Sequence, residues 1–170
     1  MSRTWVKTCL ILLIVTFITA GCYAHWPIHK IPENTKVDLV LVEKSKRRLT
    51  LFHDSKEIAT YYVSLGRSPI GAKTQEGDNK TPEGLYTIDR HKPDSAYHLA
   101  LHVSYPEKKD LIHSDPGGDI MIHGIRNGAG FIGRFHLLLD WTRGCIAVTN
   151  SEIEQIYALV ADGTPLEIKP

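Results

Sequence analysis

His123 and Cys145 are the two residues whose types and spacing could do covalent chemistry in this chain. A thiol attacks as the thiolate, and a free cysteine has a pKa of about 8.5, so it needs a nearby base or cation near neutral pH. We interpret Cys145 as a nucleophile and His123 as its base. Gly144 allows a tight bend that turns neighbouring amides towards a developing oxyanion. Taken alone, the pair also fits inert packing, because a lone cysteine is often simply buried.

The pattern around these residues resembles the L,D-transpeptidase (YkuD-like) catalytic domain family. The resemblance rests on His123-Gly124 and on the segment 140–150, D-W-T-R-G-C-I-A-V-T-N, and it covers about residues 37–169. This form of the motif is similar to a subgroup that acts on peptide links to the cross-bridge residue of peptidoglycan. Arg143 departs from the family, since most members have histidine there. That histidine is not the family's base, so the resemblance still implies His123 as base and Cys145 as nucleophile.

The resemblance implies an acyl-transfer enzyme that needs no cofactor and no metal. The thiolate would attack the carbonyl of the third residue of a peptidoglycan stem peptide, and an amine would then accept the acyl group from the thioester. Attack by water instead would make the protein a hydrolase, and members that cut the link between peptidoglycan and a bound lipoprotein carry a similar motif. A third alternative is an inactive, lipid-anchored wall-binding module. The departure from the family motif at Arg143 is the feature that favours this alternative.

Further residues around the motif are candidates for substrate contact. A stem peptide carries carboxylates, and arginine binds carboxylates in a bidentate fork. His136 could be a substrate-site group or a rival base, but only His123 matches the family's base, and Asp140 could pair with one of the arginines. The candidate substrate-binding residues are Arg143, Thr142, His136, Arg134 and Gly124.

Other classes of site and enzyme fit the chain less well. It has no His-Glu-x-x-His motif and no cysteine pair, so we expect no zinc site. A sortase-like transpeptidase also places histidine before cysteine, but it has an arginine after the cysteine. No arginine follows Cys145 in this sequence. Papain-like peptidases have the reverse order, with the cysteine first.

Residues 1–22 are typical of a bacterial secretion signal. Arg3 and Lys7 precede an apolar run over 9–18, which is shorter than the roughly 20 residues of a membrane-spanning helix. Small residues before Cys22 indicate a lipoprotein signal, cleaved before Cys22 with a lipid on its sulfur. An ordinary cleaved signal and an uncleaved anchor are the alternatives. All three place the domain outside the cytoplasm, in the periplasm of the cell envelope.

The remaining chain predicts a tether over 23–36 and one catalytic domain over 37–170. About 150 residues suffice for a single hydrophobic core. With 20 Lys and Arg against 19 Asp and Glu, the charge balance argues against nucleic acid as a partner. Beyond Cys22, Cys145 is the only cysteine, so an exported domain would carry one unpaired thiol and no disulfide.

The pattern of apolar residues predicts a mostly β domain with one clear C-terminal helix, α+β by strict count. The resemblance implies an L,D-transpeptidase-like β-sandwich. The first three expected strands would form an antiparallel meander, and the last strand before the motif would carry His123 at its end. The helix would begin at Ser151, with Glu154 completing a capping box. The expected strands are 37–42, 48–53, 58–65, 85–88, 96–103, 119–122 and a short one at 166–168.

Overall fold

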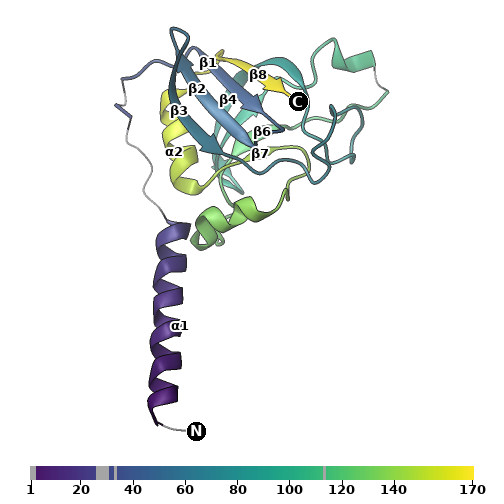
Figure 1. Ribbon diagram of the computed structural model, residues 1–170. Helices are drawn as coiled ribbons and strands as arrows, with labels where there is room; N and C mark the ends of the chain where they lie inside the picture. Colours follow the sequence, from purple (N-terminus) through teal and green to yellow (C-terminus); the bar gives the residue numbers. More distant parts are fainter. Residues whose placement is uncertain (1–2, 26–30, 33, 113) are drawn as a thin grey trace.

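The computed structural model describes residues 3–25, 31–32, 34–112 and 114–170. Beyond a long N-terminal helix, the described chain is mostly β-sheet with one α-helix near the C-terminus (Figure 1), as predicted. The helices are α1 (Arg3–Ala24), η1 (Asp110–Ile112), η2 (Gly130–Leu138) and α2 (Asn150–Leu159). The strands are β1 (Leu39–Glu43), β2 (Arg48–His53), β3 (Lys56–Tyr62), β4 (Gly84–Ser95), β5 (His98–Val103), β6 (Met121–His123), β7 (Ile146–Ala147) and β8 (Pro165–Lys169).

The eight strands form one bent sheet in the order β3-β2-β1-β8-β4-β5-β6-β7. The predicted meander of β1, β2 and β3 is confirmed, since both pairings are antiparallel. The long strand β4 joins the two halves, because its first residues, 84–87, pair with β8 and its later residues pair with β5. Two parallel pairings, β1 with β8 and β6 with β7, complete the sheet.

The two ends of the sheet meet at the segment that carries Cys145. Ser64, just after β3, exchanges two backbone hydrogen bonds with Ala147 of β7, at 2.9 and 2.8 Å. On the other side of Cys145, the Thr142 N–H donates to the Leu65 carbonyl at 3.1 Å, and the Arg67 N–H donates to the Thr142 carbonyl at 3.1 Å. Residues 64–67, which follow β3, therefore pair with the chain on both sides of Cys145. This pairing covers most of the sheet edge at β7.

A continuous apolar core fills the inside of the bent sheet. Alternate residues of β1 and β2 point into it, with Val40, Val42, Leu49 and Leu51 fully buried. This follows from the two-residue period of a strand, which places every second side chain on one face. On the other half, α2 packs against β5 through its predicted apolar face, which includes Ile153 and Ile156. The core thus fixes the strands that carry the motif.

The predicted capping box of α2 at Ser151 and Glu154 was wrong, because the capping residue lies two positions earlier. Thr149 is the N-cap, and its side-chain oxygen accepts from the Glu152 backbone N–H, while the Glu152 carboxylate accepts from the Thr149 N–H at 2.9 Å. The pair Ser151 and Glu154 has the same spacing and residue types, so sequence alone did not separate the two. Strand β7 ends at Ala147, and the helix begins at Asn150, directly after its N-cap.

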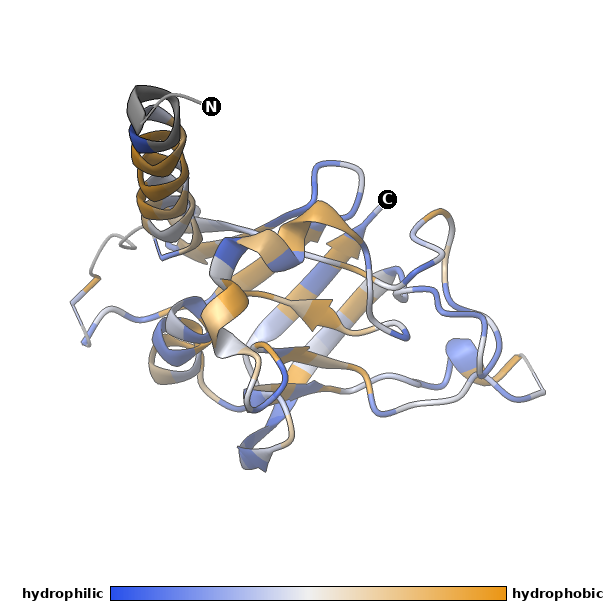
Figure 2. Ribbon diagram, turned by 90° about the horizontal axis from the view of Figure 1, so that it is seen from below, coloured by the Kyte–Doolittle hydropathy of each residue, from blue (hydrophilic) through white to orange (hydrophobic). Residues whose placement is uncertain are grey.

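The N-terminal helix α1 runs beyond Cys22 to Ala24. The stretch Lys7–Ala24 is long and apolar enough to cross a membrane, a property that secretion signals share. Figure 2 shows the hydrophobic colour over most of the helix, and Figure 1 shows it extending away from the domain. Of the expected tether, residues 26–30 and 33 lie outside the described part of the chain.

Replacing Thr149 with alanine should lower the free energy of unfolding by about 1 kcal/mol, because it removes the N-cap oxygen from α2. Urea unfolding followed by circular dichroism measures this change. Ser151→Ala is the matched control and should stay close to the parent protein. An equal loss in both variants would contradict the capping box at Thr149.

Candidate active site

Strand pairing places His123 and Cys145 on the same face of the sheet. In the parallel pair β6–β7, Ile122 lies opposite Ile146 and His123 opposite Ala147. Cys145 directly precedes β7 and so falls beside Met121, two residues from His123. Side chains alternate across a strand, so His123 and Cys145 both point away from the face that buries Ile122 and Ile146. Both residues line one cleft of about 1090 Å³.

The hydrogen bond of His123 sets which ring nitrogen can act as a base. Nδ1 lies 2.6 Å from the carbonyl oxygen of Gly124, which can only accept, so Nδ1 carries the proton and Nε2 is free to accept one. Burial lowers the pKa of His123 to about 4, because the charged imidazolium is poorly solvated there. The ring packs against Tyr97, with centroids 4.5 Å apart, and lies 5.7 Å from Trp141. At neutral pH, His123 is a neutral imidazole, protonated on Nδ1 only and held in one orientation.

The Cys145 thiol is protonated in the resting protein. Burial raises its pKa to about 11, the Met121 backbone hydrogen bond opposes that shift, and nearby Asp119 adds to it. The sulfur also lies 3.7 Å from the Asp119 carbonyl oxygen, which favours the S–H form. A resting thiolate–imidazolium pair is therefore disfavoured. The arrangement suits removal of the proton by His123 as the sulfur attacks.

Thr142 ties the segment before the nucleophile into a tight turn. Its hydroxyl donates to the Cys145 carbonyl at 2.7 Å and accepts from the Gly144 N–H at 3.1 Å. Gly144 has φ +132°, and a Cβ there would lie 2.7 Å from the Lys80 carbonyl oxygen, so only glycine fits. The Gly144 N–H donates to Thr142, so the predicted oxyanion site among the amides around Cys145 stays a prediction. Thr142 itself is buried and acts as a brace for the turn.

The second histidine of the cleft differs from His123 in its tautomer. The Trp141 indole N–H, which can only donate, lies 3.4 Å from His136 Nδ1, so the proton of a neutral ring sits on Nε2. His136 is 5% exposed, and its Nε2 has no hydrogen-bond partner among the described residues. Burial, with a smaller effect from His123, lowers the pKa of His136 to about 4. His136 is thus placed to donate to a ligand oxygen.

The cleft around the cysteine carries a positive excess. Its charged lining consists of the cations Arg67, Lys73, Arg126 and Arg143 and the anions Glu76 and Asp119. Arg143 is exposed, which agrees with the predicted role in substrate contact. Lys73 is buried and pairs with Asp78 at 2.9 Å, so the free positive charge comes mainly from the arginines.

Two predicted substrate residues have other partners. Arg134 directs its guanidinium towards the buried Glu152 carboxylate at 3.9 Å. Gly124 packs into the structure behind His123, where a Cβ would lie 2.9 Å from Asn150 Oδ1, and its carbonyl orients the His123 ring. Neither residue is among those that line the cleft, and substrate contact by them stays a prediction.

Some functional residues were missed or misassigned by sequence reasoning. Tyr97 lies far from the motif in sequence, yet it stacks on His123, and no local pattern marks it. Trp141 also lines the cleft. Asp140 binds Arg47, 2.7 Å away and remote in sequence, instead of a nearby arginine. Asn150 accepts from the Ile125 N–H at 2.8 Å, so it holds the loop after His123.

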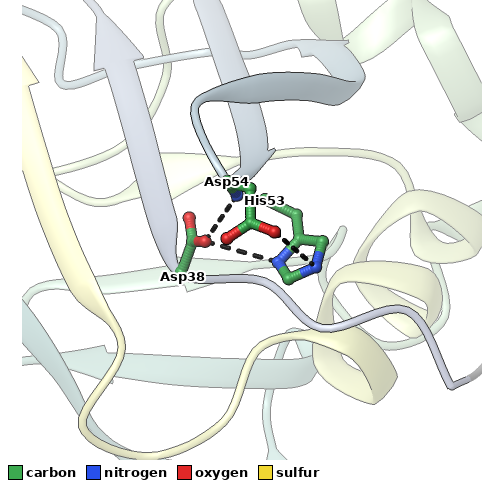
Figure 3. A group of neighbouring side chains, drawn as sticks. All are labelled: Asp38, His53 and Asp54. Atoms are coloured by element: carbon green, nitrogen blue, oxygen red, sulfur yellow. Dashed lines mark hydrogen bonds and ion pairs between the residues drawn. The ribbon is translucent and has the colours of Figure 1, made fainter.

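A group of possible metal ligands lies apart from the cleft, at the ends of β1 and β2. It consists of Asp38, His53 and Asp54 (Figure 3). The Asp38 carboxylate lies 3.3 Å from His53 Nδ1 and accepts from the Asp54 backbone N–H at 2.7 Å, so it already serves the turn after β2. The side chains are 38%, 39% and 82% exposed, which fits a solvated turn.

The fold and the site define a class of protein that comparison with known proteins also identifies. The family model of the L,D-transpeptidase catalytic domain (YkuD) matches residues 37–168. The chain belongs to this family. It is similar to the putative L,D-transpeptidase YafK of Escherichia coli strain K12, with 30% identity over 128 residues, which are 71% of this chain and 46% of YafK.

Solved structures show the same fold. Pgp2 of Campylobacter jejuni, a helical cell shape determining protein, matches 81% of this chain and 49% of its own with a TM-score of 0.62 and 28% identity. Bd1075 of Bdellovibrio bacteriovorus has a TM-score of 0.57 and 27% identity, over 81% of this chain and 49% of its own. The L,D-transpeptidase of Xylanimonas cellulosilytica, at 15% identity, matches 83% of this chain and 64% of its own with a TM-score of 0.53. The chain spans about half the length of YafK, Pgp2 and Bd1075.

The raised pKa of Cys145 predicts how this thiol responds to pH. Its alkylation by iodoacetamide should accelerate steadily from about pH 7 to about pH 10, because the thiolate fraction grows only towards a pKa of about 11. Mass spectrometry of the alkylated peptides gives the rate for each cysteine, with the exposed Cys9 and Cys22 as internal references. A rate for Cys145 that levels off near neutral pH would instead indicate a resting thiolate.

Proposed function

We propose that this protein is a cysteine acyltransferase that acts on peptidoglycan stem peptides, an L,D-transpeptidase in reaction as well as in family. The observation that carries the proposal is the β6–β7 register, which puts the free Nε2 of His123 and the Cys145 thiol on one face of one cleft. Membership in the family supports the substrate class.

In the first half of the reaction, the sulfur of Cys145 attacks the carbonyl carbon of the third stem-peptide residue. His123 Nε2 takes the thiol proton as the S–C bond forms, and the carbonyl oxygen becomes an oxyanion. The Cys145 backbone amide is the donor best placed for this oxyanion, since Thr142 engages that of Gly144. One such donor contributes on the order of 3 kcal/mol to transition-state stabilisation. The C–N bond then breaks, the leaving amine takes the proton from His123, and a thioester remains.

In the second half, an acceptor amine attacks the thioester carbon. His123 takes a proton from this amine, the C–S bond breaks, and the proton returns to the sulfur, so the enzyme ends unchanged. Two features assist this cycle. His123 is neutral at the pH of the reaction because burial lowers its pKa to about 4. The Gly124 carbonyl stabilises the transient imidazolium through Nδ1.

Substrate recognition follows from the lining of the cleft. Arg143, with Arg67 and Arg126, provides cations for the carboxylates of a stem peptide. The Nε2–H of His136 offers a buried donor for a substrate carbonyl, which would satisfy a polar group that has no partner among the described residues. Arg143 thus replaces the histidine common at this position with a longer, permanently charged side chain.

Hydrolysis is the second candidate for the reaction. The 140–150 motif resembles members that cut the link between peptidoglycan and a bound lipoprotein, and water can replace the amine in the second half-reaction. For location, we propose export to the periplasm with attachment to a membrane through the N-terminal segment, by a lipid on Cys22 or by α1 itself. The apolar stretch Lys7–Ala24 supports this attachment.

Intact-protein mass spectrometry tests the acyl-enzyme directly. Incubating the protein with purified stem tetrapeptide should add the acyl tripeptide to its mass, because the leaving residue departs as the thioester forms. Cys145→Ala is the control and should gain no mass. The released products then separate the two reactions, since transfer gives a cross-linked peptide and hydrolysis gives a free tripeptide. If the fragments bind but neither an adduct nor a product forms, the protein is an inactive wall-binding module.

Arg143→Gln should raise KM for the stem peptide about tenfold and change kcat little, because a charged hydrogen bond to a carboxylate contributes roughly 1.5 kcal/mol to binding. Steady-state assays of peptide release measure both constants. Arg134→Gln removes the same charge at a site that faces Glu152 and serves as the matched control. Equal effects of the two substitutions would argue for a general charge effect and against a carboxylate contact at Arg143.

A further inference from the structure

The end of α1 rests on η2, the segment that forms one wall of the cleft. The rings of Tyr23 and Phe135 lie 5.5 Å apart, and His25 Nε2 donates to the Phe131 carbonyl at 3.1 Å. Ala24 is 6% exposed, and a Cβ at Gly133 would lie only 2.0 Å from its carbonyl oxygen. The glycine therefore lets two backbones meet, and the contact defines where the chain leaves the domain.

The same segment exposes large apolar side chains to solvent. Phe131 is 75% exposed, Leu138 71%, and Leu139, the next residue after η2, 75%. Phe135 between them is 39% exposed, even with Tyr23 against it. Contiguous exposed apolar residues usually mark an interaction surface. Figure 1 shows η2 on the side of the domain from which α1 extends, beside the last turn of that helix.

We propose that this apolar face, formed by Phe131, Phe135, Leu138 and Leu139, rests on the surface of a phospholipid bilayer. The helix that is apolar enough to enter a membrane ends against this face, so inserting α1 brings η2 to the level of the headgroups. Phenylalanine and leucine side chains gain free energy when they move from water into the boundary between headgroups and acyl chains.

The proposed contact with the bilayer is possible whether α1 is kept or is cleaved off before Cys22. If α1 stays in place, the bilayer surface lies near Ala24, where the helix ends. If the chain is cleaved before Cys22 and carries a lipid there, Tyr23 and Ala24 still join the lipid to η2. The inference rests on the proposed membrane attachment and not on the acyl-transfer reaction.

Membrane seating also has a consequence for the substrate. Three residues of the apolar face, Phe135, Leu138 and Leu139, line the cleft beside Ile132 and His136, so the proposed bilayer contact lies at the rim of the active site. The cleft would then open close to the membrane surface. The stem peptides within reach are those of the peptidoglycan layer nearest that membrane.

Photo-crosslinking to lipid tests the seating in the full chain. The photoreactive residue p-benzoylphenylalanine replaces Phe131 in one variant and Leu139 in another, and each protein is reconstituted into vesicles of phosphatidylethanolamine and phosphatidylglycerol. After illumination, mass spectrometry of the digested protein measures lipid adducts at each position. Both positions should form adducts, since side chains at an interface contact acyl chains directly.

Ile112 provides the matched control position. It is apolar, 82% exposed and belongs to η1, which lies far from α1 in both Figure 1 and Figure 2. Lipid adducts at 131 and 139 should exceed those at 112 by about tenfold, because a position in bulk water meets lipid only by collision. Equal yields at the three positions, or crosslinks at 131 and 139 to protein instead of lipid, would overturn the proposal. Catalysis plays no part in the readout, so an inactive protein would still give a clear result.

Discussion

The meeting of the two ends of the sheet is the constraint on which the site depends. Strand β7 has only two residues and would be a weak edge alone, but Ser64 pairs with it on one side and β6 on the other. The backbone groups of this short strand are thereby satisfied on both sides, as buried polar groups must be. Since Cys145 directly precedes β7, its position is set by a pairing between chain segments about eighty residues apart.

A buried cation holds the loop that supports the nucleophile from behind. Lys44, 2% exposed, binds the Gly71 and Thr81 carbonyls at 2.7 and 2.9 Å and the Glu83 carboxylate at 2.7 Å. Between these contacts the loop carries the Lys80 carbonyl, which packs against Gly144. A buried charge is tolerated only when paired and hydrogen-bonded, and Lys44 meets both conditions. Lys44 thus helps to hold in place the loop whose Lys80 carbonyl approaches Gly144.

The two histidines of the cleft show how environment assigns chemical roles. Both are neutral because burial lowers the pKa of each to about 4. Their hydrogen bonds select opposite tautomers: a carbonyl at His123 Nδ1 leaves Nε2 as an acceptor, and the Trp141 N–H at His136 Nδ1 leaves Nε2 as a donor. One cleft thus holds a proton acceptor and a hydrogen-bond donor made from the same residue type.

By itself, the sequence determined the fold class, the family and most strands, because these depend on local patterns and on a specific motif, and it singled out Cys145 and His123 as the candidate nucleophile and base. The strand 48–53 and the apolar face of α2 follow from periodicity alone. Only the tertiary structure decided which neighbours of the motif face the cleft. Arg143 does, whereas Arg134 turns to Glu152, and Tyr97 joins the site from a distant strand connection. The physical reason is that side-chain direction and long-range pairing depend on how the sheet bends and closes, and no local pattern records that bend.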